Sequence, residues 1–311
     1  MGCAAGSTGD AAAYPDRPVR LIVPTPPGGA ADTAARIIAP KLSEILGQPL
    51  VVDNRGGASG RIGGTMAARA APDGYTLLAL IATQITDAAV TKNTPYDLER
   101  DFAPVSRTVT VPSVLIANPA LPVKSTQELI ALAKTRPGQL QFASGSAGGT
   151  SDLAMRLLES TAGIRMISVP YKGVGPALVD VLAGHVPLMF GSLISALPHI
   201  KSGRVRPLGV TSPRRSGAAP DIPTIAEAGL PGYAADTWSG LVAPAGTPRE
   251  IIVKLHAGVV QALQEPAIRK RFIDDGAEAT PNNSPEEFAA FVRSELAKWS
   301  KVVKDAGIGA Q

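Results

Sequence analysis

The 311-residue chain contains one cysteine, Cys3, which excludes an internal disulfide and any metal site built from several cysteines. Aromatic residues make up only 4% of the sequence, so platforms for stacking nucleic-acid bases are scarce. The formal net charge of +4 is small and spread along the chain. No apolar run approaches the roughly 20 residues needed to cross a bilayer. These absences predict a globular protein with no nucleic-acid partner.

Catalytic motifs are also missing. The sequence contains no G-x-S-x-G elbow, no phosphate-binding G-x-x-x-x-G-K-[ST] and no H-E-x-x-H pair. The stretch nearest to a dinucleotide fingerprint is Gly173-Val174-Gly175, but Leu178 stands at the third glycine position. The three histidines are scattered along the chain and form no cluster. We therefore expect no enzyme activity, no cofactor and no metal.

Strand-like apolar runs alternate with helical patterns through most of the chain. This alternation predicts an α/β fold with mainly parallel sheets. At 311 residues, two domains of ordinary size are expected. The candidate strands are residues 19–23, 50–53, 76–80, 103–110, 113–117, 141–143, 166–169, 188–190, 205–210 and 240–243.

Three helices carry capping signals at their start. Ser125, Thr247 and Ser284 are each followed three residues later by glutamate, which is the capping-box pattern. Pro248 would occupy the first position of the second helix. Gly307 is a candidate left-handed end for the last helix.

The most informative feature is a glycine-rich turn, residues 25–32, between an apolar strand and a helix expected at residues 33–46. Such a turn directs free backbone N–H groups and the positive end of the helix at one place, where a carboxylate can bind. A similar turn, residues 145–151, follows the apolar stretch 140–144. If both turns face one cleft, they form an anion pocket that needs no catalytic side chain.

Each turn supplies candidate ligand-binding residues. The hydroxyls of the second turn can donate to carboxylate oxygens. For Asp32 two alternatives remain open, a structural cap of the turn or a pocket group that binds a hydroxyl, an ammonium or water. The candidates in the first turn are Thr25, Pro27, Gly28, Gly29, Ala30 and Asp32, and those in the second are Ser144, Ser146, Gly149, Thr150 and Ser151.

A series of short blocks from residue 14 onward resembles the solute receptors of tripartite tricarboxylate transporters, also called Bug-type receptors. The blocks occur in the expected order and span nearly the whole chain. They include YPDRPVR (14–20), PPGG (26–29), APDGYTLL (71–78), DFAPV (101–105), VPYKG (169–173), PTIAEAGLPGY (223–233) and APAGTP (243–248).

The resemblance implies a non-catalytic, monomeric periplasmic receptor with two α/β lobes, two crossover strands and a ligand cleft between the lobes. Lobe one would hold residues 14–109 plus 240–311, and lobe two residues 110–239, with crossings near 104–114 and 238–243. The ligand would be a small organic carboxylate, held partly through ordered water at the first turn. The partners would be the membrane subunits of a tripartite transporter or, alternatively, a membrane sensor kinase.

The chain departs from the family pattern at the pocket. Many relatives have histidine where Asp152 stands, histidine near Gln84, and aspartate in place of Gly191, next to Ser192. We expect these positions, with Gln84 and Ser192 as site residues, to determine which ligand binds.

Two more candidates are left with alternatives. Lys172 would either neutralise a second carboxylate of the ligand or lie on the surface. Trp238 would either stack on a flat ligand or pack in the core at the hinge.

Residues 1–13 are small and polar, and we expect a tether or signal remnant there. The segment around Cys3 resembles the end of a lipoprotein signal, which would place a lipid anchor at this residue. The alternative is a misplaced start codon or an expression scar. The family resemblance implies a periplasmic location, with membrane tethering if Cys3 is lipidated.

Overall fold

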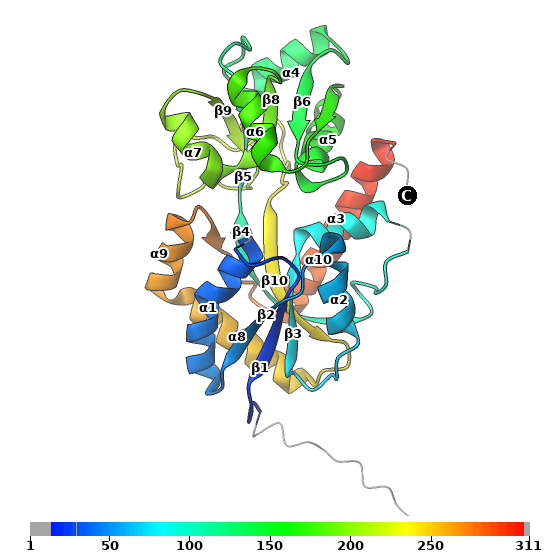
Figure 1. Ribbon diagram of the computed structural model, residues 1–311, viewed down its shortest axis with the longest axis vertical. Coiled ribbons are helices and arrows are strands. Elements are labelled where there is room, and N and C mark those ends of the chain that lie inside the picture. Colours follow the sequence, from blue (N-terminus) through cyan, green and yellow to red (C-terminus); the bar gives the residue numbers. More distant parts are fainter. Residues whose placement is uncertain (1–13, 29, 92, 308–311) are drawn as a thin grey trace, which may run out of the picture.

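The structure is a computed structural model that describes residues 14–28, 30–91 and 93–307. Its strands form two sheets that follow one another along the long axis of the molecule (Figure 1). The six-stranded sheet has the order β11-β4-β10-β3-β1-β2, and the five-stranded sheet has the order β7-β6-β8-β5-β9. No helix in the described part of the chain is long and apolar enough to span a bilayer.

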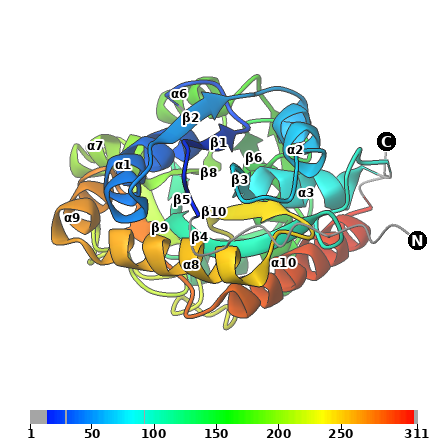
Figure 2. The ribbon, with the colours of Figure 1, turned by 90° about the horizontal axis from the view of Figure 1, so that it is seen from below.

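The six-stranded sheet is covered on both faces. Neighbouring β1 residues show this, because Leu21 packs with α1, α8 and α9 whereas Ile22 packs with α2, α3 and α10. Figure 2 shows α1 and α2 on opposite sides of β1. The elements are β1 (Val19–Val23), α1 (Ala30–Leu46), β2 (Leu50–Asn54), α2 (Arg61–Ala68), β3 (Thr76–Ile81), α3 (Ala82–Val90), β4 (Phe102–Val111), β10 (Thr237–Pro244), α8 (Arg249–Gln264), α9 (Pro266–Asp274), β11 (Glu278–Ala279) and α10 (Pro285–Asp305).

The five-stranded sheet has the same three-layer build. Its core face toward α4 and α5 contains Leu115 and Phe142, and the face toward α6 and α7 contains Val114 and Ala143. The elements are β5 (Ser113–Ala117), α4 (Thr126–Thr135), β6 (Gln141–Ser144), α5 (Thr150–Ala162), β7 (Ile167–Pro170), α6 (Val174–Ala183), β8 (Leu188–Ser192), α7 (Leu193–Lys201) and β9 (Arg206–Val210).

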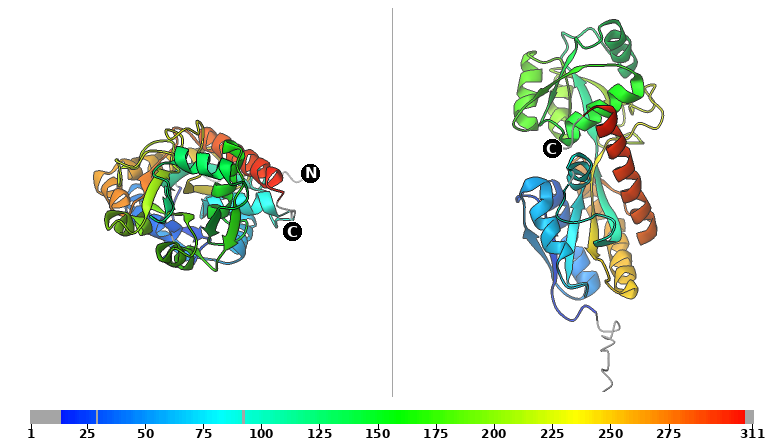
Figure 3. Two further views of the ribbon diagram at one scale, coloured as in Figure 1. Left: turned by 90° about the horizontal axis from the view of Figure 1, so that it is seen from above. Right: turned by 90° about the vertical axis from the view of Figure 1, so that its right-hand side faces the viewer.

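Helix α10, drawn in red, lies against both sheets' layers (Figure 3, right). Its residues Trp299, Val302 and Val303 belong to the same buried cluster as Leu153 and Leu158 of α5. The cluster therefore continues from the layers of one sheet to those of the other.

Two strands carry the chain between the sheets. β4 ends at Val111 and β5 begins at Ser113, so the chain passes into the second sheet at Pro112. β10 returns it, and pairs antiparallel with β4 from Thr237 opposite Val111 to Pro244 opposite Phe102. We call β4 and β10 the connecting strands.

The α/β class is confirmed, but the expectation of mainly parallel sheets is wrong. Parallel pairing is found for β1 with β2 and β3, and for β6 with β7 and β8. The connecting strands run in opposite directions, so β10 pairs antiparallel with both β3 and β4. β5 likewise pairs antiparallel with β8 and β9. Both sheets are therefore mixed.

The capping signals were right at two of three helices. The Ser125 hydroxyl accepts from the Glu128 N–H at 3.1 Å, and the Ser284 hydroxyl accepts from the Glu287 N–H at 3.2 Å. The expected cap at Thr247 is wrong, because its hydroxyl donates to the Pro244 carbonyl at 2.7 Å. Pro248 is the N-cap of α8, which begins one residue later, at Arg249.

The cap at Ser284 gives a first stability prediction. Ser284→Ala removes the N-terminal side-chain cap of α10 and should lower the free energy of unfolding by about 1 kcal/mol. Denaturant titration measures the loss. Ser284→Thr keeps the hydroxyl and should stay within about 0.5 kcal/mol of the parent. An alanine variant as stable as the parent would contradict the capping role.

Candidate ligand cleft

The two glycine turns share one internal design. In the first turn Gly28 has a φ of +82°, and its N–H donates to Asp32 Oδ2 at 2.8 Å. In the second turn Gly148 has a φ of +67°, and its N–H donates to Asp152 Oδ2 at 3.0 Å. The left-handed backbone at each position requires glycine. Each aspartate lies four residues beyond its glycine and closes the turn.

Asp32 is hydrogen-bonded within the first turn, and only 3% of the residue is exposed. Asn54 Nδ2 donates to its Oδ1 at 2.9 Å, and Arg36 Nε donates to the same oxygen at 3.0 Å. Burial alone would raise the pKa of Asp32, but hydrogen bonds from Arg36, Gly28 and Asn54 hold it below its ordinary value. Of the two alternatives left by the sequence, the contacts match the structural one.

Asp152 does the same in the second turn, where it is 4% exposed. The Ser168 hydroxyl donates to its Oδ1 at 2.7 Å, and Arg156 Nε lies 3.9 Å from that oxygen. The sequence carries this likeness as GGAADTAAR (28–36) and GGTSDLAMR (148–156), a shared GGxxDxAxR pattern. The departure from the family at Asp152 therefore makes the second turn a copy of the first.

Both turns end at a helix N-terminus, and both helices open on one cavity. α1 begins at Ala30 and α5 at Thr150, so the first N–H groups of each helix have no partner inside it. Ala30, Thr150 and Ser151 all line a cavity of about 400 Å³. The two turns thus face the same space from the two sheets.

The walls of this cavity are uncharged. None of the described residues that line it carries an ionisable side chain, and its polar groups are hydroxyls. The residues are Ala30, Val111, Ser113, Thr150, Ser151, Val174, Gly175, Leu178, Phe190, Gly191, Ser192, Ser195, Ala235 and Thr237. A second cavity of about 400 Å³ adjoins it through Ala30, Val111 and Ser192. We call the two together the cleft.

The only charged residues among the described ones that line the cleft come from α9 and its end. They are Arg271, Asp274 and Asp275. Arg271 Nε donates to Asp275 Oδ2 at 3.0 Å, so these two charges largely offset each other. Asp274 forms an ion pair with Lys270 at 2.7 Å, so among the described residues the donors that the cleft offers an anion are helix ends and hydroxyls, and not unpaired basic side chains.

Five candidates from the sequence line the cleft, namely Gly28, Ala30, Thr150, Ser151 and Ser192. Their donors differ in availability. The Gly28 N–H is engaged by Asp32, contrary to the expectation that it would be free for a ligand. The Ser151 hydroxyl accepts from the Gly145 N–H at 3.0 Å and retains its own proton to donate.

Other candidates in the turns serve the turns themselves. The Gly149 N–H donates to the Ser146 carbonyl at 3.2 Å. Ser144 is fully buried, and its hydroxyl lies 3.3 Å from that of Ser168. The Thr25 carbonyl accepts from Asn54 at 3.1 Å. Pro27 is exposed. Gly29 and Cys3 lie outside the described residues.

Three further candidates lie away from the cleft. Gln84 is buried, and its amide is used in a hydrogen bond within the fold, in which Nε2 donates to the Tyr96 hydroxyl at 2.8 Å. Lys172 is exposed and is not among the described residues that line either cavity. Trp238 is 2% exposed, donates to Glu295 Oε2 at 3.2 Å and packs on Phe288. For Trp238 the core alternative therefore matches.

Sequence reasoning missed the part of the cleft formed by the connecting strands. Val111, Ser113 and Thr237 line it where the chain crosses between sheets. Ser195 and the α6 start at Val174 were missed as well. No motif marks them, although the GGxxDxAxR repeat was visible and could have identified the two turns as equivalent half-sites.

Comparisons with known proteins agree with this geometry. Residues 34–308 match the family described as "Tripartite tricarboxylate transporter family receptor". The chain is 40% identical over 297 residues to Protein BugT of Bordetella pertussis, covering 94% of this chain and 90% of BugT.

Solved structures give the same picture. A Rhodopseudomonas palustris protein solved with adipate is 38% identical with a TM-score of 0.77, covering 94% of this chain and 98% of that one. MatC from the same species, solved with bound malate, is 34% identical with a TM-score of 0.73, covering 93% and 100%. The periplasmic binding protein BugD is 35% identical with a TM-score of 0.75, covering 96% and 100%. This chain therefore belongs to the Bug-type receptors of the tripartite tricarboxylate transporter family, whose members are periplasmic solute-binding proteins.

Proposed function

We propose that the protein captures a small organic carboxylate in the cleft and presents it to the membrane subunits of a tripartite transporter. The observation that carries the proposal is the convergence of two equivalent turns, one from each sheet, on one uncharged cavity. Each turn ends at a helix start, where the first N–H groups have no partner inside the helix, the backbone arrangement that binds anions.

The electrostatics favour an anion over a neutral ligand. Each helix N-terminus carries roughly half a positive charge, and its interaction with an anion is worth about 0.3–1 kcal/mol at an exposed site and up to about 2 kcal/mol when partly buried. α1, α5 and α6 all begin at residues of the cleft. Hydroxyls of Thr150 and Ser192 add donors that suit carboxylate oxygens.

The shape of the cleft favours a carboxylate with an apolar body. Val111, Leu178 and Phe190 form much of the wall between the two turns. Adipate and malate, bound by the relatives, are dicarboxylates, and this supports the same class here. With two equivalent turns, a dicarboxylate can place one carboxylate at each helix start.

We propose a non-catalytic cycle in which the two lobes, residues 14–109 plus 240–311 and residues 110–239, close on the ligand about the connecting strands. Hinge closure of this kind is an established mode of conformational change. Capture and release require no bond to be made or broken, and the proposal needs no cofactor. The periplasmic location follows from the family, and lipid tethering through Cys3 stays a hypothesis.

Calorimetric titration tests the proposed ligand class. Adipate and malate should give saturable heat, and the neutral diamide of adipate should bind at least tenfold more weakly because it lacks both charges. A ligand at 100 times its Kd should add about 2.7 kcal/mol to the free energy of unfolding and raise the melting temperature. Equal binding of the diamide, or no heat across a panel of carboxylates, would contradict the proposal.

Transport is tested separately, in cells that carry the membrane subunits. Uptake of a labelled ligand should require the receptor and should fall when the receptor gene is deleted. Unchanged uptake without the receptor would contradict the transport role and leave ligand capture intact.

A further inference from the structure

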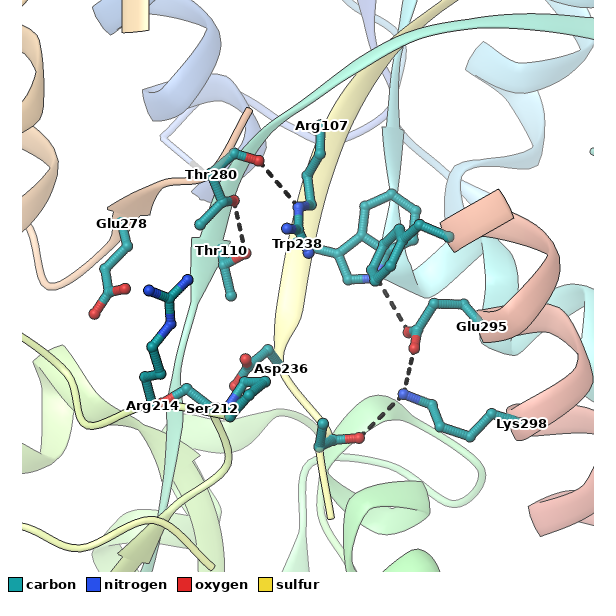
Figure 4. A pocket seen from close by; sticks show the side chains of 13 residues that line it. Arg107, Thr110, Ser212, Arg214, Asp236, Trp238, Glu278, Thr280, Glu295 and Lys298 are labelled. Carbon is teal, nitrogen blue, oxygen red and sulfur yellow. Dashed lines mark hydrogen bonds and ion pairs between the residues drawn. The ribbon is translucent and has the colours of Figure 1, made fainter. Parts of the chain in front are cut away.

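A third cavity, of about 150 Å³, lies on the side of the connecting strands opposite the cleft (Figure 4). Successive strand residues point to opposite faces, so Val111 and Thr237 line the cleft while Thr110 and Trp238 line this cavity. We call it the rear cavity. Its ionisable side chains are Arg107, Arg214, Asp236, Glu278, Glu295 and Lys298.

The rear cavity is lined by residues from the six-stranded sheet's side and from the five-stranded sheet's side of the molecule. Arg107 of β4, Glu278 of β11 and Lys298 of α10 come from the side of the six-stranded sheet. Arg214 follows β9 of the five-stranded sheet. A rotation about the connecting strands that narrows the cleft must therefore widen the rear cavity. The cleft and the rear cavity should therefore change volume in opposite directions.

One group of charges in the rear cavity is already satisfied. Glu295 forms an ion pair with Lys298 and accepts from the indoles of Trp238 at 3.2 Å and Trp299 at 3.1 Å. Lys298 also donates to the Ala234 carbonyl at 3.0 Å. This group anchors α10 to the chain that leads into β10.

A second group is not paired. Among the described residues, no ion pair within 4 Å joins Arg107 or Arg214 to Asp236 or Glu278. Arg107 instead donates to the Thr280 carbonyl at 3.1 Å and lies over the Phe291 ring at 4.6 Å. Basic and acidic side chains thus line the same cavity without a direct ion pair between them.

Asp236 stands at the point where the chain enters β10. Its Oδ1 accepts from the Thr211 hydroxyl at 2.6 Å, and Thr211 in turn bonds Ser113 at the start of β5. Asp236 is thus linked to both crossings, to β10 as the residue before it and to β5 through the Thr211 hydroxyl. In the described part of the chain, the hydroxyl of neighbouring Ser212 is buried without a partner and also lines the cavity.

The pKa of Asp236 depends on how much water the rear cavity admits around its half-buried side chain. Burial raises its pKa to about 7, while the Thr211 hydroxyl and the Lys298 ammonium act in the opposite direction. Glu278 and Glu295 add to the rise. Because the largest cause is burial, widening the cavity and admitting water should return the pKa toward its ordinary value.

We propose that Asp236 and the rear cavity form a latch that couples closure of the cleft to ionisation of one carboxyl group at the hinge. In the narrow cavity, where Asp236 is half-buried, the neutral acid is favoured, and in the widened, wetter cavity the carboxylate is favoured. Closure on a ligand therefore releases a proton from Asp236. By linkage, ligand affinity rises with pH until pH exceeds the higher of the two pKa values, near 7.

The size of the effect follows from that pKa. If the pKa of Asp236 is about 7 before closure and returns to the ordinary value of about 4 after it, affinity should be about tenfold weaker at pH 6 than at pH 8. Asp236→Asn fixes the group in a neutral form that still accepts from Thr211, so its affinity should not change over this range. Asp221→Asn, an exposed position, is the matched control and should behave like the parent.

Intrinsic fluorescence tests the latch without any ligand. The chain has two tryptophans, Trp238 and Trp299, and both donate to Glu295 at this cavity. Their emission should titrate with a midpoint near pH 7 in the parent and in Asp221→Asn, but not in Asp236→Asn. The same midpoint in all three proteins would overturn the proposal.

Calorimetry with adipate as the probe tests the coupling to closure. The parent should show the tenfold change between pH 6 and pH 8, and Asp236→Asn should not. A parent with no pH dependence, or an Asp236→Asn variant that keeps it, would overturn the latch. Absence of adipate heat in every protein counts against the proposed function alone, and fluorescence then decides the latch.

Discussion

Asp32→Ala is expected to lower the free energy of unfolding by about 2 kcal/mol and to weaken carboxylate binding at least tenfold. The change leaves the Gly28 N–H and the Asn54 amide without their shared acceptor. Neither donor is fully buried, so each lost hydrogen bond costs about 1 kcal/mol. Arg36 is half exposed and regains water, so its ion pair contributes little to the sum.

Binding suffers because the turn loses its shape. Without the bond from Gly28, the backbone before α1 is no longer held in the left-handed conformation, and the helix start at Ala30 is displaced from the cleft. Denaturant titration and calorimetry measure the two effects. Asp152→Ala should repeat both at the second turn, whereas Asp221→Ala, at an exposed position, should change neither. A stable Asp32→Ala with parental affinity would contradict this account.

The same carboxylate makes a pH prediction. The pKa of Asp32 is lowered on folding, so its contribution to stability is present above the unfolded-state pKa, near 4, and is lost as pH falls through the folded value. The difference in the free energy of unfolding between the parent and Asp32→Ala should therefore shrink in acid. Unfolding curves at pH 7 and at pH 3 check this, and a difference that grows in acid would contradict it.

Much of the fold was predictable because buried strands are short apolar runs bounded by turn residues. β1 and β5 were predicted with both ends correct, and the other eight predicted strands overlap the observed ones. β11 was missed because a two-residue strand carries no periodicity. The start of α1 was predicted at residue 33 instead of Ala30, because the first three helical residues were assigned to the glycine turn.

The site was predictable only where the backbone itself forms it. The glycine turns can be recognised in the sequence, and both lie at the cleft. Side-chain directions were not predictable: along β10 the cleft receives Thr237 and the rear cavity receives Trp238, and the strand register decides which. Lys172 shows the same limit, since a strand end fixes its position but not where its long side chain lies.

The family resemblance supplied the rest of the site prediction, and its limits are physical as well. The resemblance led to Gln84 as a pocket residue, yet in this chain the Gln84 amide bonds Gly60 and Tyr96. It also marked Asp152 as a departure without indicating its effect. Only the contacts of Asp152 with Gly148 and Ser168 reveal a second closed turn.

Ala30→Asp is expected to abolish capture of anions while leaving the fold at least as stable as the parent. A carboxylate in the first turn of α1 interacts favourably with the helix N-terminus, by about 0.3–1 kcal/mol. Ala30 also lines both cavities of the cleft, so the new charge lies where the ligand carboxylate would bind. Two like charges about 4 Å apart repel by about 4 kcal/mol at an effective dielectric constant of 20. Adipate affinity should therefore fall more than 100-fold.

The neutral variant Ala30→Asn separates charge from bulk. Asparagine has nearly the same size as aspartate, so steric hindrance would weaken adipate equally in both variants, whereas charge repulsion weakens it only in Ala30→Asp. We expect Ala30→Asn to bind within about tenfold of the parent, which corresponds to 1.4 kcal/mol. Melting curves recorded beside the titrations establish that both variants are folded. If Ala30→Asp is folded and still binds adipate as the parent does, the helix starts are not the anion site, because no carboxylate could share that position with a second one.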